Sequence, residues 1–397
     1  MPLSKASGLK IVSIDVRDVR FPTSLGGHGS DALHTDPNYS CAYVTTTLEN
    51  GRQGFGLTFT CGRGTEVIEL VSTIDFRYIT DVITKDEAIK LLKSKRAGRE
   101  DRIKLLMEKG YPAYTTQAGE LIMLYQIIQT TLYIESRLAG SLHRWGIQRR
   151  PFSVFRRASA VHKSLHNILI FISGWLGYSD ETLKELCDKY LRLGFTHFKV
   201  KVGLNFEDDY RRCSAVRRYI GDNRVLVRTH GGCEPSLEPY GIGVATGEMC
   251  ANRVMFKQFL QSGGMQYCQI DSARIGSVNE ILSVYLMAEK LKVKVCPHAG
   301  GVGLCEMVQH LQYWDFASVS ATMEGRLVEY VDQQHEHFVD PCVVVDARYL
   351  APKVAGYSTQ FLPGTVEKFG YPNGSEWKRM IKEGLFPAPD EAEMVNA

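Results

Sequence analysis

The sequence lacks an apolar run long enough to cross a membrane, which takes about 20 predominantly apolar residues. The longest candidate, residues 121–134, is shorter and contains Gln126 and Gln129. The ten cysteines include no C-x-x-C pair and follow no regular spacing. This pattern argues against a zinc site or a disulfide framework and favours reduced thiols in an intracellular compartment. The N-terminus lacks an apolar signal segment, and Asp15 and Asp18 come early, so we expect neither a signal peptide nor a transit peptide.

A strong excess of either charge is also absent. The chain has 47 Lys and Arg against 44 Asp and Glu, a net charge of +3 that does not by itself indicate a nucleic-acid partner. With 44% hydrophobic and 23% charged residues, the composition excludes a disordered chain and a collagen-like repeat. The length of 397 residues exceeds the roughly 250 of one (β/α)₈ barrel and falls short of three average domains.

Residues 117–173 differ from the rest of the chain. They contain seven basic and two acidic residues, while the remainder contains 40 basic and 42 acidic ones, so this segment supplies the whole positive balance. It shows neither a helical nor a strand period and has few turn signals. One interpretation is a basic insertion that binds a partner. The interpretation that we favour is an insertion without a folded role.

Elsewhere, helical and strand-like patterns alternate as they do in parallel βα units. Residues 9–21 and 40–47 alternate apolar and polar side chains, which predicts two strands with a glycine-rich loop between them. A second region is expected to begin with a strand at 73–79 and a helix at 84–106 that starts with a capping box. The later part predicts the following elements in order: a helix ending at Gly194, strands 196–202 and 266–271, a helix at 278–291, and a strand at 292–297.

The segment Phe198-Lys199-Val200-Lys201-Val202-Gly203 ends one of these strands. Because side chains alternate along a strand, the two lysines point to one face and the apolar residues to the other. Each lysine should lower the pKa of the other, and a lowered pKa suits a general base. The alternative is an edge strand with solvated lysines. Residues 292–295 repeat the pattern at the start of a strand, whereas barrel chemistry collects at carboxyl ends, so we interpret this second pair as structural or solvated.

Three further polar residues stand where strands are expected to end: Glu248 in Ala-Thr-Gly-Glu, Asp271 in Gln-Ile-Asp-Ser and His298 in Cys-Pro-His-Ala-Gly-Gly. The intervals of 23 and 27 residues fit successive units of a barrel, which repeats about every 31 residues with wide scatter. Asp271 on the neighbouring strand would orient His298 and favour its imidazolium form. Singly, each residue is more often structural. Together with Lys201 they predict an active site on one rim.

The motifs K-V-K-V-G, A-T-G-E, Q-I-D-S and C-P-H-A-G-G, in this order, resemble the enolase superfamily, mandelate racemase subgroup. The N-terminal loop F-P-T-S-L-G-G-H-G-S-D and the residues Tyr330-Val331-Asp332 narrow the resemblance to its L-fuconate dehydratases. The resemblance covers residues 9–66, 73–116 and 174–397. It implies an α/β fold, a TIM-type (β/α) barrel with an N-terminal α+β capping domain.

The resemblance also implies magnesium-dependent dehydration of an acid sugar, L-fuconate, to a 2-keto-3-deoxy acid. Lys201 would remove the proton α to the carboxylate, and Lys199 would hold that carboxylate. His298, oriented by Asp271, would protonate the departing 3-hydroxyl. The implied substrate contacts are Gly29, Ser30, Asp31, Tyr39 and Glu329. Glu324 is a weaker candidate for the substrate contact assigned to Glu329.

The chain departs from the family at the magnesium ligands, which are three carboxylates at the ends of three successive strands. Glu248 matches the third, and Thr229 stands where the first is expected. Only 47 residues separate Lys201 from Glu248, although three βα steps need about 75 to 90, so the fourth strand and its glutamate are expected to be absent. Glu234 and Glu238 could serve only as substitute ligands. We therefore expect an incomplete barrel and impaired turnover.

The expected domains are a capping region at 1–72 without its helical part, a barrel at 73–339 interrupted by the insert 117–173, and a C-terminal segment at 340–397 that packs on the cap. The expected partners are Mg²⁺ and a small acid sugar, with no nucleic acid and no membrane, and homo-oligomerisation is left open. The expected location is the cytoplasm or, by the resemblance, the mitochondrion. The alternative function is a non-catalytic family derivative that binds or regulates a partner through its basic insert.

Overall fold

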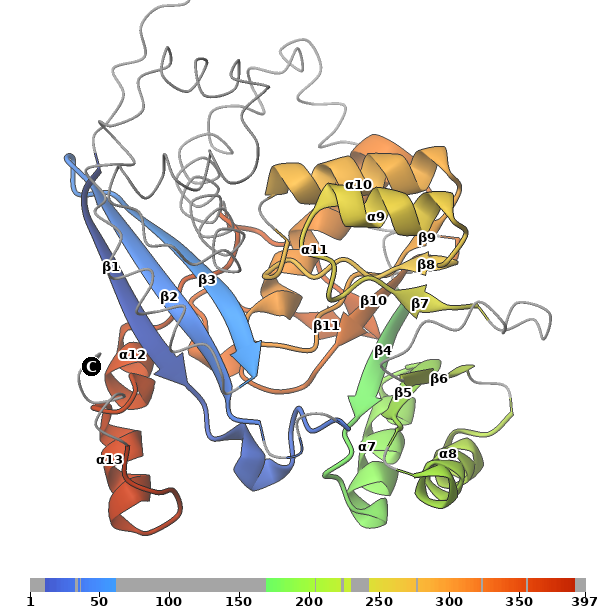
Figure 1. Cartoon of the computed structure of the whole chain (residues 1–397), viewed down its shortest axis with the longest axis horizontal. Helices are drawn as coiled ribbons and strands as arrows, with labels where there is room; N and C mark the ends of the chain where they lie inside the picture. The colour runs from blue at the N-terminus through green and yellow to red at the C-terminus, as the bar shows by residue number, and fades with distance from the viewer. Residues whose placement is uncertain are drawn as a thin grey trace, which may run out of the picture.

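The computed structural model describes most of three stretches of the chain. These are residues 11–61 apart from 33, 34 and 36, residues 169–229 apart from 204, 223 and 224, and residues 243–389 apart from 276, 277, 323 and 355. The expected strand at 73–79, the helix at 84–106 and most of the basic insert lie outside these ranges. An antiparallel sheet with the C-terminal helices forms one side, and parallel βα units form the other (Figure 1). Within the described ranges, no helix is long and apolar enough to span a bilayer.

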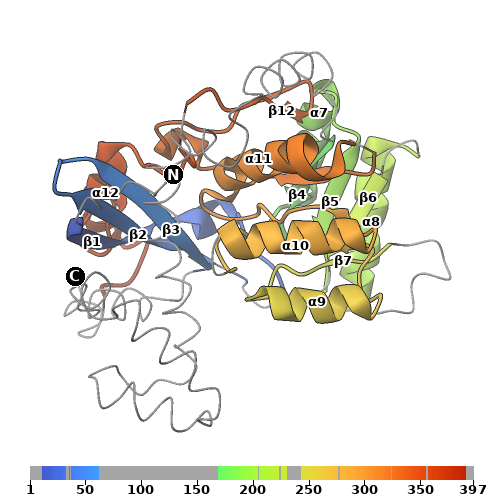
Figure 2. The ribbon, with the colours of Figure 1, turned by 90° about the horizontal axis from the view of Figure 1, so that it is seen from above.

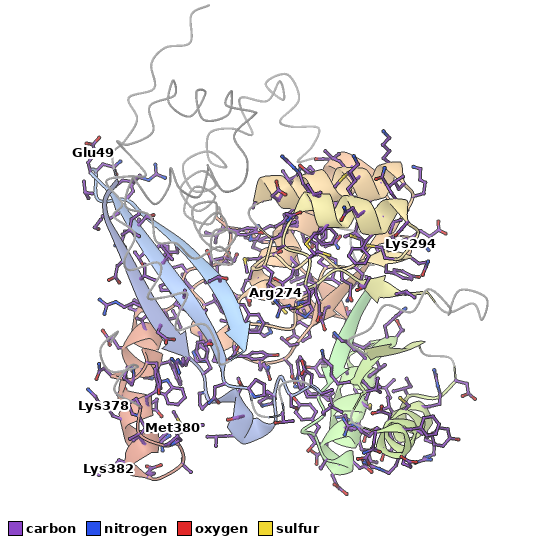
Figure 3. All side chains as sticks on the ribbon, viewed as in Figure 1. Glu49, Arg274, Lys294, Lys378, Met380 and Lys382 are labelled. Atoms are coloured by element: carbon purple, nitrogen blue, oxygen red, sulfur yellow. The ribbon has the colours of Figure 1, made fainter. Side chains whose placement is uncertain are left out.

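The antiparallel sheet consists of β1 (Ile11–Arg20), β2 (Tyr39–Leu48) and β3 (Gln53–Cys61), in that order. The first two strands were predicted from their alternation, and the structure confirms them. The third was not predicted, although Leu57 and Phe59 alternate with other residues and are buried. The strands β2 and β3 form a hairpin whose tip carries Glu49 (Figure 3).

The C-terminal helices α12 (Pro363–Phe369) and α13 (Ser375–Lys382) lie beside β1 (Figure 1). The backbone N–H of Tyr371 donates to the carbonyl of Asp18 (2.8 Å), and the indole Nε1 of Trp377 donates to the carbonyl of Arg20 (2.9 Å). Met380 is buried, whereas Lys378 and Lys382 lie on the outer side of α13 (Figure 3). The C-terminal segment therefore covers the first strand of the sheet.

Seven parallel strands within the described ranges form two groups with the orders β10-β4-β5-β6 and β7-β8-β9. The strands are β4 (Leu169–Gly174), β5 (His197–Lys201), β6 (Val225–Thr229), β7 (Ala245–Thr246), β8 (Tyr267–Cys268), β9 (Lys294–Val295) and β10 (Leu327–Tyr330). The helices between them are α7 (Asp180–Arg192), α8 (Phe206–Ile220), α9 (Arg253–Gln261), α10 (Val278–Lys290) and α11 (Leu304–Asp315). Figure 2 shows α9, α10 and α11 side by side. Repeated parallel βα units of this kind are the units of a TIM-type barrel.

Short elements complete the described fold. The 3₁₀ turn η1 (Thr23–Gly26) follows β1, and the π-helical turn η4 (Phe316–Ser320) continues α11. The 3₁₀ turn η5 (His335–His337) and the small hairpin of β11 (Val344–Val345) and β12 (Arg348–Tyr349) follow β10.

Strand β4 corrects one boundary of the sequence analysis. Residues 169–173 were assigned to the unmatched insert, but they form strand β4 between β10 and β5. A parallel strand that is covered on both faces is apolar at successive positions and shows no alternation. The sequence Leu-Ile-Phe-Ile at 169–172 is apolar at successive positions, so its pattern does not distinguish it from the preceding segment.

Helix α7 illustrates how local signals set the predicted elements. The Ser179 hydroxyl accepts a hydrogen bond from the N–H of Thr182 (3.1 Å) at the first turn, and Gly194 has φ +85° just beyond the last. The predicted helices before Gly194 and at 278–291 are thus confirmed.

On α8, the buried Arg212 donates to the carbonyls of Trp175 (2.6 Å) and Tyr178 (2.9 Å). This contact fixes the segment that follows β4.

Candidate active site

The two lysines of β5 are buried together. Phe198 and Val200 are 1% and 0% exposed on the core side, and Lys199 and Lys201 are 3% and 8% exposed on the other. The predicted alternation is confirmed, and the alternative of solvated lysines at this strand is wrong.

The second lysine pair has the opposite environment. Lys292 and Lys294 are exposed, and the Lys292 ammonium lies 2.7 Å from Glu289 at the surface. Figure 3 shows Lys294 at the outer edge of the molecule. The interpretation of this pair as solvated is confirmed.

Glu329, at the carboxyl end of β10, holds Lys199. The Lys199 Nζ lies 2.5 Å from Glu329 Oε1, and both side chains are almost fully buried. Burial lowers the pKa of Lys199, but the charges of Glu329 and Glu248 outweigh it and raise that pKa above its usual value. Burial and the charge of Lys199 lower the pKa of Lys201. The predicted pKa decrease is therefore confirmed for Lys201 and wrong for Lys199, whose carboxylate partner the sequence analysis lacked.

Asp271 and His298 form the predicted pair. Their backbones meet in a parallel bridge, and the His298 Nδ1 lies 2.8 Å from Asp271 Oδ2. The other oxygen, Oδ1, accepts the N–H groups of Ala273 (2.8 Å) and Arg274 (2.9 Å). Because an ionised carboxylate only accepts hydrogen bonds, Nδ1 carries a proton.

The His298 Nε2 faces two more carboxylates, with Glu248 Oε2 at 3.2 Å and Glu329 Oε2 at 3.6 Å. Burial lowers the pKa of His298, but these carboxylates and the hydrogen bond to Asp271 raise it above its usual value overall. Burial would raise the pKa of Glu329, but Lys199 and His298 lower it well below its usual value. The site therefore combines a histidine of raised pKa with a lysine of lowered pKa.

Glu248 follows β7 through Gly247, whose φ is +127° and whose Cβ position would lie 2.8 Å from the carbonyl oxygen of Gln269. Only glycine fits there. The charge of His298 lowers the pKa of Glu248 to about 2. Within the described residues its Oε2 is buried and accepts no hydrogen bond, because the contact with His298 lacks hydrogen-bond geometry. A buried, ionised oxygen without a donor suits a hard cation such as Mg²⁺.

The other residues considered as magnesium ligands contribute no further carboxylate within the described part of the chain. Thr229 is the last residue of β6, and Glu234 and Glu238 lie outside the described residues. The expected loss of the fourth strand falls at residues 230–242, which are also outside them.

The N-terminal loop packs on the barrel side of the molecule. Gly29 has φ +81°, and a Cβ there would lie 2.2 Å from the Tyr39 ring. The Ser30 hydroxyl donates to the carbonyl of Gly27 (2.7 Å) and accepts the N–H of Gly177 (2.6 Å) just after β4. These contacts hold the loop against the end of β4.

Two of the predicted substrate contacts in this region, Ser30 and Tyr39, are buried and hydrogen-bonded to the protein backbone. Ser30 and Tyr39 are 1% and 2% exposed, and the Tyr39 hydroxyl donates to the carbonyl of Gly300 (3.0 Å) near His298. Asp31 is partly exposed, and its negative charge acts to raise the pKa of Lys201, against the larger lowering effects of burial and Lys199. Glu324, the rival of Glu329, is exposed and precedes β10, so it lies at the wrong end of that strand.

Two residues near the site were missed. The Lys201 Nζ lies 5.5 Å from the ring centroid of Trp175, which is buried directly after β4. Arg274 Nη1 lies 3.5 Å from Asp271 Oδ2, and Figure 3 shows Arg274 between the β1–β3 sheet and the parallel units. Trp175 could have been found from the end of β4 had that strand been assigned, and Arg274 from its place three residues after Asp271.

The fold and the site can now be compared with known proteins. A sequence-family model described as enolase C-terminal domain-like matches residues 236–364. Mitochondrial enolase superfamily member 1 from Bos taurus is 36% identical, over 94% of this chain and 98% of the relative. The chain belongs to the enolase superfamily. That alignment runs over 489 positions, more than the 397 residues of the chain, so it includes segments of the relative that have no counterpart here.

Other members widen the comparison. L-galactonate dehydratase from Hypocrea jecorina is 31% identical over 94% of this chain and 96% of the relative. The crystal structure of human mitochondrial enolase superfamily member 1 has a TM-score of 0.69 and 36% identity, and the match covers 96% of this chain and 99% of that one. L-talarate/galactarate dehydratase from Salmonella typhimurium LT2, liganded with Mg and L-lyxarohydroxamate, has a TM-score of 0.60 at 14% identity, over 92% of this chain and 94% of that one.

This membership confirms the predicted fold class, a TIM-type barrel with an N-terminal capping domain. The absence of the fourth strand remains a prediction.

Proposed function

We propose that the chain is a magnesium-dependent dehydratase of acid sugars with L-fuconate as its substrate. The observation that carries the proposal is the presence, at one rim, of a buried lysine with a lowered pKa and a histidine bound to an aspartate. Glu248 and Glu329 act electrostatically on both Lys201 and His298, so the two groups share one environment. The names of the relatives support the substrate class, since they include L-galactonate dehydratase.

Lys201 and His298 would divide the proton transfers between them. Lys201 accepts the proton α to the substrate carboxylate, because its lowered pKa favours the neutral amine. His298 donates a proton from Nε2 to the departing 3-hydroxyl, since Nδ1 is held by Asp271. Water leaves, and the enol product tautomerises to the 2-keto-3-deoxy acid.

Lys199 and Glu329 would set the electrostatics of the carboxylate end. Lys199 contributes positive charge near the substrate carboxylate. Glu329 is fully buried, with Oε1 on Lys199 and Oε2 accepting the N–H of Ala299 (2.9 Å). We therefore assign Glu329 as a positioning residue. The loop with Gly29, Ser30, Asp31 and Tyr39 would enclose the sugar, with the partly exposed Asp31 nearest to solvent.

Glu248 would hold the magnesium ion, which supplies positive charge that stabilises an enediolate. Mg²⁺ prefers near-octahedral oxygen ligands, so one carboxylate with water ligands binds it weakly. We propose weak magnesium binding and slow turnover for this reason. The Bos taurus relative is named mitochondrial enolase superfamily member 1, and we propose the mitochondrion as the location.

A screen of acid sugars tests the proposal, with the 2-keto product detected by semicarbazide over a range of Mg²⁺ concentrations. We expect L-fuconate to be converted slowly, with the rate still rising at millimolar Mg²⁺. Turnover of another acid sugar but not of L-fuconate would contradict the substrate. No turnover of any acid sugar at saturating Mg²⁺ would contradict the dehydratase activity.

Calorimetric titration with Mg²⁺ tests the proposed ligand separately. We expect weak binding that is lost in Glu248→Gln. Tight binding that depends on Glu248 would mean that further carboxylates complete the site, and slow turnover would then need another cause.

A further inference from the structure

Four side chains with metal-ligating atoms gather at a second place in the molecule. Cys305 and Glu306 lie in the first turn of α11, His335 begins η5, and Cys342 lies between η5 and β11. The two sulfurs and a ring nitrogen of His335 all lie within 4.8 Å of one another. The His335 Nδ1 is 3.5 Å from Cys342 Sγ and 2.7 Å from Glu306 Oε1. Nothing in the proposed dehydration uses these residues.

The spacing of these atoms suits a tetrahedral ion. Zinc lies about 2.3 Å from thiolate sulfur and about 2.0 to 2.1 Å from imidazole nitrogen, so adjacent sulfur and nitrogen ligands stand about 3.5 Å apart. The distance between His335 Nδ1 and Cys342 Sγ equals this value. Glu306 Oε1 is hydrogen-bonded to Nδ1 at 2.7 Å, which is too close for a second ligand of the same tetrahedron. Glu306 therefore stands beside the three ligand atoms and orients the imidazole.

His335 is oriented as a metal ligand would be. Its Nε2 donates to the carbonyl oxygen of Val331 (2.6 Å), so Nδ1 faces the two cysteines. The ring stacks on Tyr330 with the centroids 5.2 Å apart and the planes 7° from parallel. Metal-binding histidines commonly donate their second ring N–H to such a carbonyl.

Burial and access also fit an ion site. Cys305, Cys342 and Glu306 are buried, whereas the His335 side chain is 18% exposed and provides a path from solvent. Soft thiolates select zinc over magnesium. The absence of a C-x-x-C pair argued against zinc, but these ligands come from residues 305 to 342 and meet only in the fold.

We propose that Cys305, Cys342 and His335 form a three-ligand site for a thiophilic divalent cation, zinc first, with the fourth position open to water. Binding releases the thiol protons and the proton between His335 and Glu306. The ion joins the start of α11 to η5 and to the segment that precedes β11. It also stands next to the active-site framework, because Cys305 Sγ lies 3.6 Å from the carbonyl oxygen of Ala299, whose N–H binds Glu329.

Cobalt titration of the purified, reduced, metal-free chain tests the site. We expect one Co²⁺ per chain with a thiolate-to-cobalt charge-transfer band and the strong visible bands of tetrahedral cobalt, both removed by Zn²⁺. Cys342→Ser, Cys305→Ser and His335→Asn should each weaken binding by about 100-fold or more, since even outer-shell changes cost 10- to 100-fold. Cys187→Ser, which removes a buried cysteine on α7, and Glu248→Gln should leave the band unchanged.

Protection of the wild-type thiols from alkylation, read by peptide mass spectrometry, tests the site without any substitution. Zn²⁺ should slow the modification of Cys305 and Cys342 but not that of Cys187. Absence of the charge-transfer band in the wild-type chain would overturn the proposal. So would a band that persists in both cysteine variants, or weak cobalt absorption that only Glu248→Gln removes. Equal alkylation of all three cysteines with and without Zn²⁺ would also count against it.

Discussion

The sequence Lys-Val-Lys-Val occurs twice, at residues 199–202 and 292–295, in opposite environments. The lysines of the first copy are 3% and 8% exposed, whereas the side chain of Lys292 in the second is 79% exposed. The lysines of the first copy are the third and last residues of β5, whereas Lys292 precedes β9 and Lys294 is its first residue. In a parallel barrel the carboxyl ends of the strands collect the polar groups of the active site. Position within the strand, rather than the motif, therefore decides the environment.

The ion pairs of the two copies differ in the same way. Lys199 pairs with Glu329 where both side chains are almost fully buried, and an unpaired charge there would cost several kcal/mol. Lys292 pairs with Glu289 at the surface, where such pairs contribute about 0 to 1 kcal/mol. The same residue types thus supply a framework for catalysis in one place and a solvated contact in the other.

The largest expected effect is on the reaction. Lys201→Met should lower kcat by 10²- to 10⁴-fold, the usual contribution of a general base, because it removes the amine that we propose accepts the substrate proton. Lys294→Met should change kcat by less than about twofold, because its side chain is solvated. Initial rates of 2-keto product formation from L-fuconate measure both. A similar loss in the two variants would remove the distinction between the copies.

The next effect is on stability. Glu329→Gln leaves Lys199 buried without its charged partner and should lower the free energy of unfolding by about 3 to 5 kcal/mol. Lys292→Gln removes the exposed pair, leaves the contact between Glu289 and Arg326 in place, and should lower the free energy of unfolding by about 1 kcal/mol or less. Urea denaturation followed by circular dichroism gives both values. Losses of equal size would mean that water reaches the Lys199–Glu329 pair.

Local patterns were enough to predict part of the fold and site. Period-two alternation placed Lys199 and Lys201 on one face, and the intervals between strand ends brought Asp271 and His298 together. Strand β4 could not be recognised in the same way, because its residues Leu-Ile-Phe-Ile are all apolar and show no alternation.

Other features depend on segments that are distant in the chain. Glu329 lies 130 residues from Lys199, and no local pattern indicates that their side chains pair. Ser30 and Tyr39 were correctly placed in the N-terminal loop region, but the sequence does not tell whether such side chains face a substrate or the protein. The Cys305–His335–Cys342 cluster likewise has no local spacing signature.

A buried imidazole extends the contrast between buried and solvated charges. His310 on α11 has its Nε2 2.9 Å from the Ser358 hydroxyl, and burial lowers its pKa to about 4. The ordinary value in the unfolded chain is about 6.5. Between these values the unfolded chain binds more protons, so stability falls as the pH decreases from 6.5 to 4, by about 2 to 3 kcal/mol.

Unfolding free energies at pH 7 and pH 4.5 for the wild type and His310→Gln measure this contribution. The wild type should lose about 2 kcal/mol more than the variant between the two pH values. An identical loss in both proteins would show that His310 is protonated in the folded chain as readily as in the unfolded chain.

The smallest expected effect belongs to the solvated copy. Lys292 has φ +59°, in the left-handed region, where a side chain costs about 1 to 2 kcal/mol and glycine costs little. Lys292→Gly removes that strain, which stabilises the folded chain. It also removes the weak contact with Glu289 and increases the conformational entropy of the unfolded chain, and both effects are destabilising. The net free energy of unfolding should rise by about 0.5 kcal/mol. Lys294→Gly, two residues later in β9, should lower it by about 0.5 to 1 kcal/mol, because glycine weakens a strand. Thermal unfolding of the pair gives the two signs, and a loss in both would mean that the left-handed backbone at Lys292 carries no strain.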